Sequence, residues 1–462
     1  MARKVLLIGL DCADPRLVFD LWRDDLPNLR RLMEQGSYGR LRSSDPPITV
    51  PAWTSMMTSL DPGELGFYGF RNRADYSYDK MGLATARQVP PRTVWDLLGR
   101  VGKRSTLLGV PQTFPPRPIN GQMVTCFLTP STQSPYTFPP ELKDEVEAAG
   151  GGEYIFDVSD FRSEDKQRIL DDIYTMTERQ FKVFRHLLRT KAWDYAMMVV
   201  MGTDRIHHGF WQYCFPDHPL YTPNNGLESS IHDYFVYVDG QIGQLLAEID
   251  AETLVLVVSD HGARGMDGGI CVNEWLIQQG YLVLKEQPQG IIPLEKAAID
   301  WERTTAWAAG GYYARLYLNV AGREPQGQVA PADYERVRDE IATRLAALGD
   351  EQGRPIGTFS VKPQEIYRTV RNIAPDLIVY FGDLAWRSLG TVGHGVIHKF
   401  ENDTGPDGAN HDWYGLLIAY DPQRPQGGRR LEDRQLMDMA PSILREFGVA
   451  PLPDMQGQPI DW

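Results

Sequence analysis

The sequence predicts an α/β fold in which helices cover both faces of a doubly wound, mostly parallel central sheet. Three observations favour this fold class. Short apolar runs at 5–10, 195–201 and 253–258 are typical of strands buried on both faces. Segments with helical periodicity lie between them, most clearly at 231–249. Acidic and glycine residues follow the runs, where open α/β sheets place their ligands.

The first half of the chain alternates between strand and helix signals. Residues 26–36 have helical spacing, and residues 94–101 predict a helix that leads into a strand at 105–110. Proline and glycine are dense over 111–152, which predicts an irregular excursion across the surface. Residues 165–190 then predict a long helix.

This alternation changes after about residue 275. The following segments predict a strand, a helix and a short strand, at 312–319, 332–348 and 376–380. A strand at 415–420 and a helix at 437–447 then return to the earlier pattern. We therefore expect a catalytic core formed by 1–274 and 406–462, with 275–405 inserted as a smaller subdomain or cap.

Composition and charge exclude several classes of protein. The 462 residues are 42% hydrophobic and 23% charged, as in ordinary globular proteins, and the formal charge of -14 disfavours a nucleic-acid partner held by general electrostatics. No apolar run approaches the roughly 20 residues that span a bilayer, and the run after the N-terminus is too short for a signal-peptide core. Four widely spaced cysteines fit free thiols, so we expect a cytoplasmic protein: Cys12, Cys126, Cys214 and Cys271.

The segment 48–60 reads as a loop that runs into a helix. Pro51 is tolerated in a first helical turn, so Thr49 lies at or just before the helix N-terminus. Free backbone N–H groups there favour an anion, and a hydroxyl at this position can act as a nucleophile whose attack builds negative charge. The alternative is an ordinary N-cap threonine.

Three acids, Asp11, Asp204 and Asp260, each end a predicted strand. Asp204 and His208 have the i, i+4 spacing that puts two side chains on one face of a helix, and His261 directly follows Asp260. A single Asp–His pair is usually a structural contact. Several such groups at one sheet edge would repel and desolvate one another without a cation, so the pattern indicates a divalent metal site.

Five motifs in a fixed order, spread over essentially the whole chain, carry a family resemblance. They are Leu7-Ile8-Gly9-Leu10-Asp11, Thr49-Val50-Pro51-Ala52-Trp53, Asp204 with His208, Asp260-His261-Gly262, and His411 with Gly415. With these motifs the chain resembles the alkaline phosphatase superfamily, and within it the type I phosphodiesterase/nucleotide pyrophosphatase-like phosphohydrolases. The resemblance implies an alkaline phosphatase-like core and a hydrolase acting on phosphoric ester bonds.

The resemblance also implies a site with two divalent metal ions. One ion would be held by Asp11, Asp260 and His261, with the Thr49 hydroxyl coordinated as well. The other would be held by Asp204, His208 and His411. Such ligands suit both zinc and manganese, and we expect Zn²⁺ because it binds more tightly, with Mn²⁺ as the alternative.

The resemblance further implies a two-step mechanism. Thr49 attacks a phosphate ester and forms a phosphothreonine, and water then releases the phosphoryl group. Two ions on the order of 4 Å apart would stabilise the attacking and leaving oxygens. The amide of Val50 would receive a phosphoryl oxygen. The expected substrate is a small phosphate ester or a nucleotide-like molecule, with a phosphodiester or pyrophosphate favoured over a monoester.

The sequence departs from the family pattern near its glycine-rich loop. Relatives that hydrolyse nucleotide diesters carry a phosphate-holding asparagine there, and Phe70 occupies that place. Asn72, Arg71 and Arg73 are candidate replacements. Aromatic residues around the nucleophile either pack in the core or form an apolar wall for the substrate: Trp53, Phe67, Tyr68 and Phe70.

Two other functions fit the same motifs. A phosphomutase of the superfamily would share the metal core, and a non-catalytic member would bind metal as a scaffold. Sulfate ester hydrolysis is disfavoured because sulfatases need a cysteine or serine nucleophile, and this chain has Thr49.

Overall fold

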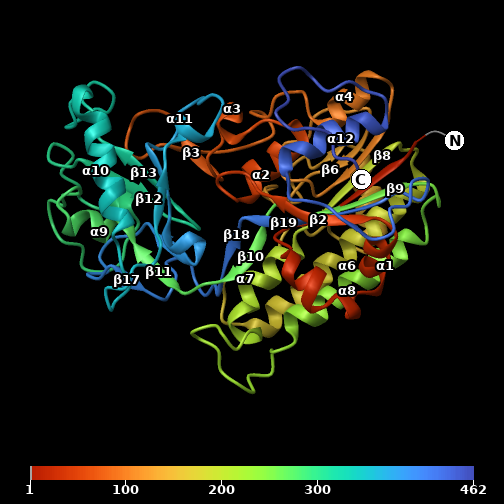
Figure 1. Ribbon diagram of the computed structural model, residues 1–462, viewed down its shortest axis with the longest axis horizontal. Helices are drawn as coiled ribbons and strands as arrows, with labels where there is room; N and C mark the ends of the chain where they lie inside the picture. Colours follow the sequence, from red (N-terminus) through yellow and green to blue (C-terminus); the bar gives the residue numbers. More distant parts are fainter. Residues whose placement is uncertain (1–2) are drawn as a thin grey trace.

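The computed structural model describes residues 3–462, so Met1 and Ala2, with which the predicted core begins, lie outside the described residues. Within them, ten strands form a central sheet flanked by helices, as predicted (Figure 1). The strands are, in sheet order, β20 (Arg429–Arg430), β2 (Ser37–Arg42), β19 (Tyr414–Tyr420), β9 (Leu254–Val258), β1 (Val5–Leu10), β8 (Tyr195–Val200), β5 (Ser105–Leu108), β6 (Gly121–Val124) and β7 (Thr137–Phe138), with β21 (Arg434–Gln435) beside β2.

Parallel pairing brings three strand ends to one edge. β1 lies between β8 and β9, and its register pairs Leu10 with Val200 and Gly9 with Val258. Because the three strands run the same way, the residues that follow them meet at the carboxyl edge of the sheet. The antiparallel strand β19 then pairs with β9 and β2.

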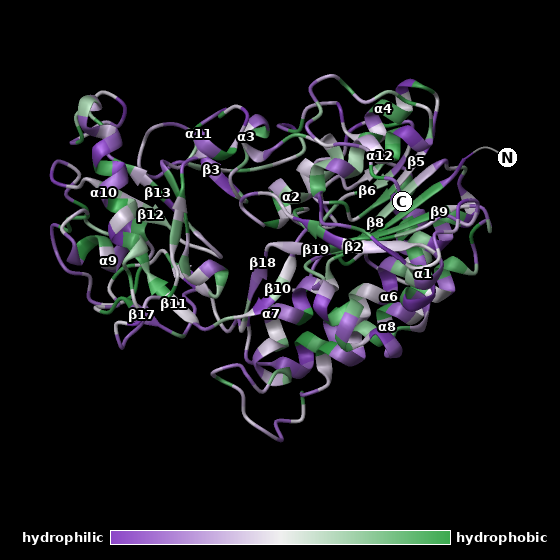
Figure 2. Ribbon diagram, in the orientation of Figure 1, coloured by the Kyte–Doolittle hydropathy of each residue, from purple (hydrophilic) through white to green (hydrophobic). Residues whose placement is uncertain are grey.

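Helices cover both faces of the sheet, and alternate residues of β1 enter two separate hydrophobic clusters. One face packs against α1 (Pro27–Gln35), α6 (Lys166–Thr190), α7 (Gly202–Cys214) and α8 (Ser230–Leu246). The other packs against α2 (Thr49–Thr58), α4 (Val94–Arg100) and α12 (Met439–Glu446). Figure 2 shows the hydrophobic strands between these two layers.

The region 111–152 differs from the prediction. It contains the sheet strand β6 and the helix α5 (Leu142–Gly150), so it is not simply an irregular excursion. β6 pairs in parallel with β5, and Gly121, at a φ of 141°, lies so close to the Ser105 backbone that a Cβ would clash. The glycine that reads as a loop signal is thus required by strand packing.

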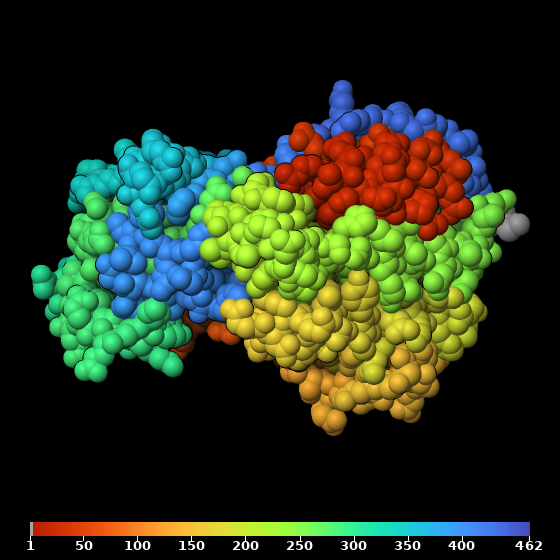
Figure 3. Space-filling model, turned by 90° about the horizontal axis from the view of Figure 1, so that it is seen from below, coloured from red at the N-terminus to blue at the C-terminus, as the bar shows by residue number. Residues whose placement is uncertain are grey.

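A smaller lobe lies beside this core (Figure 3). One of its sheets is four-stranded and antiparallel, in the order β12 (Ala306–Ala309), β13 (Ala314–Leu318), β15 (Leu377–Tyr380) and β14 (Phe359–Val361). Another joins β16 (Trp386–Leu389), β11 (Gly268–Cys271) and β17 (His398–Lys399). The helices α9 (Val272–Gln278) and α10 (Tyr334–Ala346) share its hydrophobic cluster. The short elements α3 (Pro62–Leu65), β3 (Arg71–Arg73), β4 (Met81–Leu83) and α11 (Pro363–Ile366) lie towards this lobe in Figure 1.

Two paired strands connect the lobes. β10 (Gly262–Gly265) runs antiparallel to β18 (Ala409–Asp412), and the chain between them forms the smaller lobe. The domain limits at 274/275 and 405/406 stay a prediction.

Two predictions from composition can be compared with the structure. The four cysteines are free, as expected. Within residues 3–462, the helices are too short or too polar to cross a membrane.

Candidate active site

The carboxyl edge of the sheet gathers the predicted residues from five separate elements. Asp11 follows β1, Thr49 opens α2, and His411 lies in β18. The other four residues follow β8 and β9, where α7 carries Asp204 and His208 and the turn before β10 carries Asp260 and His261. All seven side chains are buried, with exposures of 0% to 3%.

His261 Nε2 is the meeting point of one half of the site. It lies 3.2 Å from Asp260 Oδ2, 3.4 Å from Thr49 Oγ1 and 3.7 Å from Asp11 Oδ1. The Thr49 hydroxyl therefore shares a small volume with two carboxylates and one imidazole.

Asp204 is the meeting point of the other half. Its Oδ1 lies 3.2 Å from His208 Nε2 and 3.8 Å from His411 Nε2. The rings of His261 and His411 stack with centroids 3.7 Å apart, so the two halves are in direct contact. Two groups of possible ligand atoms, each within 4.8 Å of one another, share Asp204: Cys12, Asp204, His208 and His411, and Asp11, Asp204 and His261.

Unsatisfied polar atoms show that these residues fit a cation. Within residues 3–462, Asp11 Oδ1, Asp260 Oδ2 and His208 Nε2 are buried without a hydrogen-bond partner. Burial raises the pKa of Asp11, and the charge of Asp204 raises it further. Burial and the charge of Asp11 likewise raise the pKa of Asp260. A bound cation would relieve both costs, because it offsets carboxylate repulsion and desolvation.

Each site imidazole is oriented through its Nδ1 atom. That atom lies 2.8 Å from Pro47 O in His411, 3.1 Å from Gly262 O in His261 and 2.8 Å from Asp407 Oδ1 in His208. An Nδ1–H that donates to such an acceptor leaves Nε2 as the free donor atom for a metal.

Burial and neighbouring charges give the imidazoles different acidities. Burial lowers the pKa of His261 to about 4, and burial with its histidine neighbours holds that of His411 well below the usual value. Both rings are thus neutral at pH 7, which is the form that binds metals. Burial also opposes the charge on His208, but Asp407 and Asp204 outweigh it and raise its pKa to about 9.

A comparison with protein families identifies the chain. The model of the type I phosphodiesterase/nucleotide pyrophosphatase family matches residues 5–407. The chain belongs to this family. It is therefore a phosphohydrolase of the phosphodiesterase/pyrophosphatase type that acts on phosphoric ester bonds, and the expected resemblance is confirmed. A comparison with curated proteins finds no match.

Solved structures share the fold of this family member at low sequence identity. Human ectonucleotide pyrophosphatase/phosphodiesterase 5 matches with a TM-score of 0.58 and 13% identity, over 99% of this chain and 97% of that chain. The murine counterpart matches with a TM-score of 0.56 and 12% identity, over 98% and 96%. Its inactive threonine-to-alanine variant in complex with AMP gives 0.57 and 12%, over 98% and 96%.

Asp407 is a site residue that the sequence reasoning missed. It is buried, accepts from Arg162 Nε at 2.9 Å and from Arg387 Nη1 at 2.6 Å, and its other oxygen contacts His208. These three cations hold the pKa of Asp407 well below its usual value, although burial opposes them. Its only signal in the sequence was its position four residues before His411.

Arg205 was missed as well. Its guanidinium binds Asp204 directly and donates to Asp157 at 2.7 Å. Burial raises the pKa of Asp204, but the charges of His208 and Arg205 outweigh burial and hold this pKa well below its usual value. Arg205 thus keeps Asp204 ionised.

Cys12 stays protonated, because burial and the charge of Asp204 raise the pKa of its thiol. A protonated thiol is a poor metal ligand.

Trp53 does not form the predicted wall for a substrate. It is 0% exposed, and its Nε1 donates to Asp11 Oδ2 at 2.7 Å. Its ring packs beneath β1 against Gly9. The ring is part of the hydrophobic core because α2 packs on the sheet. Trp53 therefore orients Asp11 from the core side and is not exposed to a substrate.

Asn72 hydrogen-bonds within its own turn. Its Oδ1 accepts from Tyr68 N at 2.8 Å and its Nδ2 donates to Gly69 O at 3.0 Å, so its amide is used within its own turn. Phe70 is partly exposed and packs edge-on against Phe127, with ring centroids 6.0 Å apart.

The Val50 N–H has no acceptor within residues 3–462, as expected in a first helical turn.

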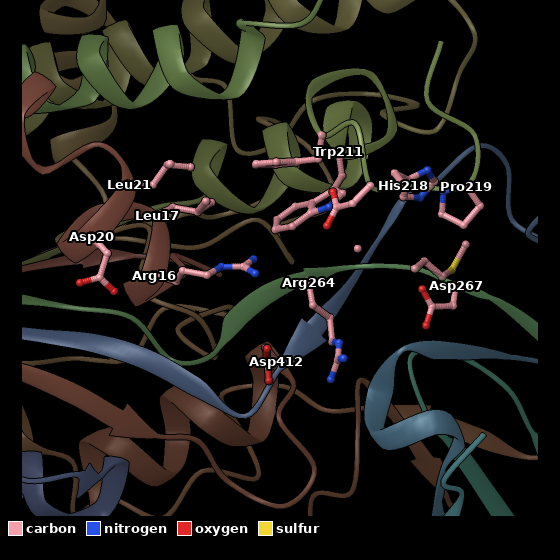
Figure 4. A pocket seen from close by; sticks show the side chains of 14 residues that line it. Arg16, Leu17, Asp20, Leu21, Trp211, His218, Pro219, Arg264, Asp267 and Asp412 are labelled. Carbon is pink, nitrogen blue, oxygen red and sulfur yellow. The ribbon is translucent and has the colours of Figure 1, made fainter. Parts of the chain in front are cut away.

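A cavity of about 590 Å³ lies on the other side of the β10–β18 ladder (Figure 4). Arg264 of β10 and Asp412 of β18 face Arg16, Trp211 and His218 across it. Its lining shares the ladder and the helix α7, through Trp211, with the candidate ligands, but it includes none of them. It is therefore separate from the candidate active site.

Proposed function

We propose that this chain hydrolyses phosphodiesters or pyrophosphates by nucleophilic attack of the Thr49 hydroxyl. The observation that carries the proposal is the convergence of Thr49 with three carboxylates and three imidazoles in one buried cluster. A threonine-to-alanine variant of the murine relative is inactive, which supports the choice of threonine.

The residues of the chain have distinct tasks in this proposal. Thr49 Oγ1 forms a bond to phosphorus as the ester bond to the leaving group breaks, which gives a phosphothreonine. The proton of the hydroxyl passes to solvent, and the leaving oxygen takes up a proton from solvent. Water then breaks the phosphothreonine and restores Thr49. The N–H of Val50 binds a phosphoryl oxygen at the positive end of α2.

We propose two divalent ions as cofactors, with Asp11, Asp260, His261 and Thr49 as ligands of one, and Asp204, His208 and His411 as ligands of the other. When bound, such ions supply positive charge that lowers the pKa of an attacking hydroxyl and stabilises phosphoryl oxygens. Three carboxylates with three imidazoles suit Zn²⁺ first and Mn²⁺ second.

The substrate and location are proposed on narrower grounds. A nucleotide-like molecule is supported by the family and by the AMP complex of the murine relative. The cytoplasmic location stays a prediction, supported by the four free cysteines.

Replacement of Thr49 by alanine tests the mechanism. We expect Thr49→Ala to lose turnover of bis(4-nitrophenyl) phosphate by at least about a thousandfold, because no other hydroxyl replaces the nucleophile. Its zinc content, measured by elemental analysis, should stay near that of the wild type.

Thr54→Ala is the matched control. This threonine lies on the same helix, and its hydroxyl donates to Val50 O at 2.7 Å. It should keep most of the activity. A Thr49→Ala protein with wild-type turnover would refute the mechanism, and formation of an isomerised phosphate ester in place of hydrolysis would favour the phosphomutase.

A further inference from the structure

The segment that follows β5, residues 109–114, lies at the same edge of the sheet as the candidate ligands. We call this segment the β5 loop. β5 and β8 pair in parallel, so both strands end at the carboxyl edge. A Cβ on Gly109 would lie 3.1 Å from Val199 O, which places the start of the loop directly beside the end of β8. The β5 loop therefore begins next to the strand that leads to Asp204.

Elements of the candidate site lie on both sides of this loop. In the order of the sheet, β5 lies between β8 and β6. The segments after these two strands meet across the end of β5, because the Arg205 guanidinium of α7 lies 5.7 Å from the centroid of the Phe127 ring. Val110 belongs to the hydrophobic cluster that contains Trp53 of α2. The β5 loop is thus packed between the helix that opens with the candidate nucleophile and the helix that carries two candidate ligands.

Gln112, in the middle of this loop, has a side-chain amide with no partner. The residue is only 4% exposed, a burial close to that of the seven site residues. Within residues 3–462, it is the one glutamine or asparagine whose two amide atoms are both buried without a hydrogen bond. Asn72 is the contrast, since both of its amide atoms bond within its own turn. An unpartnered buried amide costs free energy in the free protein and is available to a ligand.

The backbone of the loop holds Gln112 in an uncommon conformation. Its φ is 65°, in the left-handed region that residues other than glycine rarely adopt. The Thr113 hydroxyl closes the turn by donating to Val110 O at 2.6 Å. Such conformations cost free energy, and they concentrate at sites that bind ligands. The turn therefore sets the direction in which the Gln112 side chain leaves the backbone.

A second donor without a partner lies at this edge of the sheet. The Val50 N–H opens α2, where the positive end of the helix dipole favours an anion. Both donors are neutral, so neither competes with the carboxylates for a cation. Fixed donors of this kind stabilise negative charge that builds on an oxygen during a reaction.

We propose that the Gln112 side chain binds a nonbridging oxygen of the reacting phosphoryl group, together with the Val50 N–H. Gln112 Nε2 donates to this oxygen, and Oε1 accepts from a water molecule. The proposal rests on the proposed function, since it assigns a further catalytic residue to the attack of Thr49. Because the contact is to the phosphoryl group itself, it serves diesters and pyrophosphates alike.

Gln112→Met tests the proposal, because methionine keeps the length of the side chain and removes the amide. We expect kcat/KM for bis(4-nitrophenyl) phosphate to fall about 10- to 100-fold. The Tm should stay the same or rise, since no buried amide is left unpartnered. Gln112→Gly suits the positive φ and should show the same loss of activity.

Gln122→Met is the matched control. This glutamine is also buried, in the first half of β6, and its Nε2 donates to Thr106 Oγ1 at 3.2 Å. The substitution should change kcat/KM by less than threefold. If Gln112→Met and Gln112→Gly kept wild-type kcat/KM, or if both lost Tm together with activity, Gln112 would be a structural residue and the proposal would be overturned.

A binding measurement supplies a readout that is independent of turnover. Inorganic phosphate titrated calorimetrically into the zinc-loaded protein, freed of excess zinc, should bind at least tenfold more weakly to Gln112→Met than to the wild type. Equal affinities would overturn the assignment of Gln112 and leave the proposed function standing. A wild-type protein that cleaves neither diesters nor pyrophosphates would refute the proposed function, while the phosphate titration would still decide whether Gln112 binds a phosphoryl oxygen.

Discussion

At the scale of single residues, two buried side chains orient members of the carboxylate–imidazole cluster. Trp53 holds Asp11 through its indole N–H, and Asp407 holds His208 through an imidazole N–H. Such supports fix the direction of a ligand atom and its protonation. The rigidity of the site therefore comes from the buried side chains, such as Trp53 and Asp407, that hydrogen-bond to the candidate ligands.

Trp53→Phe should weaken zinc binding by about 10- to 100-fold, because it removes one hydrogen bond to a ligand carboxylate. Isothermal titration with zinc measures this change. Trp193→Phe is the control, since this indole is also buried and donates to Leu188 O at 3.1 Å, before the amino end of β8 and so opposite to the carboxyl edge of the sheet. Equal zinc affinity in both variants would mean that Trp53 only fills space.

The sequence allowed the clustered carboxylates and imidazoles to be predicted but not the side chains that support them; their role as metal ligands stays a prediction. Asp11 and Asp260 directly follow buried strands, and Asp204 lies in the first turn of the helix after one; the strands themselves follow from hydrophobic patterning. The roles of Trp53 and Asp407 depend on which atoms face each other after folding. Asn72 was a candidate for phosphate binding because of its chemistry, but local hydrogen bonds in its own turn had already used its amide.

At the scale of elements, the seating of α2 on β1 sets the position of Thr49. Gly9 of β1 lies beneath the Trp53 ring, and a Cβ there would meet Trp53 and approach Val199 Cγ2 to 2.9 Å. The helix can approach the strand this closely only because residue 9 is a glycine.

Gly9→Ala should therefore destabilise the protein by about 1–3 kcal/mol, since an added methyl group overpacks this contact. It should also lower activity by displacing α2. Urea unfolding measures the first effect and turnover the second. Gly240→Ala provides an opposite control, because its added methyl group meets no atom within 4 Å on an exposed turn of α8. That substitution should stabilise the helix by up to about 1 kcal/mol.

Element prediction succeeded where a single pattern dominated. Strands β1, β8 and β9 and the helices α6 and α8 lie within a few residues of their predicted ranges, because long apolar or periodic runs leave few alternatives. β6 was missed because four residues between glycine and proline signals are too few to show a period.

At the scale of the whole molecule, we expect the seven buried site residues to link metal binding to folding. Carboxylates and imidazoles that lack a cation destabilise the folded chain, and an ion that binds only the folded form reverses this.

Zinc at about 100 times its dissociation constant should stabilise the fold by about 2.7 kcal/mol, and a chelator should remove this gain. Thermal unfolding followed by circular dichroism measures the difference in Tm. Asp260→Asn should show little of it, because one ligand carboxylate is lost. Identical melting of the chelated and zinc-loaded wild type would contradict a metal site formed by these residues.

The ladder between β10 and β18 has a consequence for how this architecture diversifies. Gly265 and Ala409 are register partners, so the long excursion between them departs and returns at one spot. An excursion from a relative that keeps Asp407 beside His208 can replace this one and leave His411 in register with β10. New leaving-group preferences can then arise by grafting, without rebuilding the chemistry at the sheet edge.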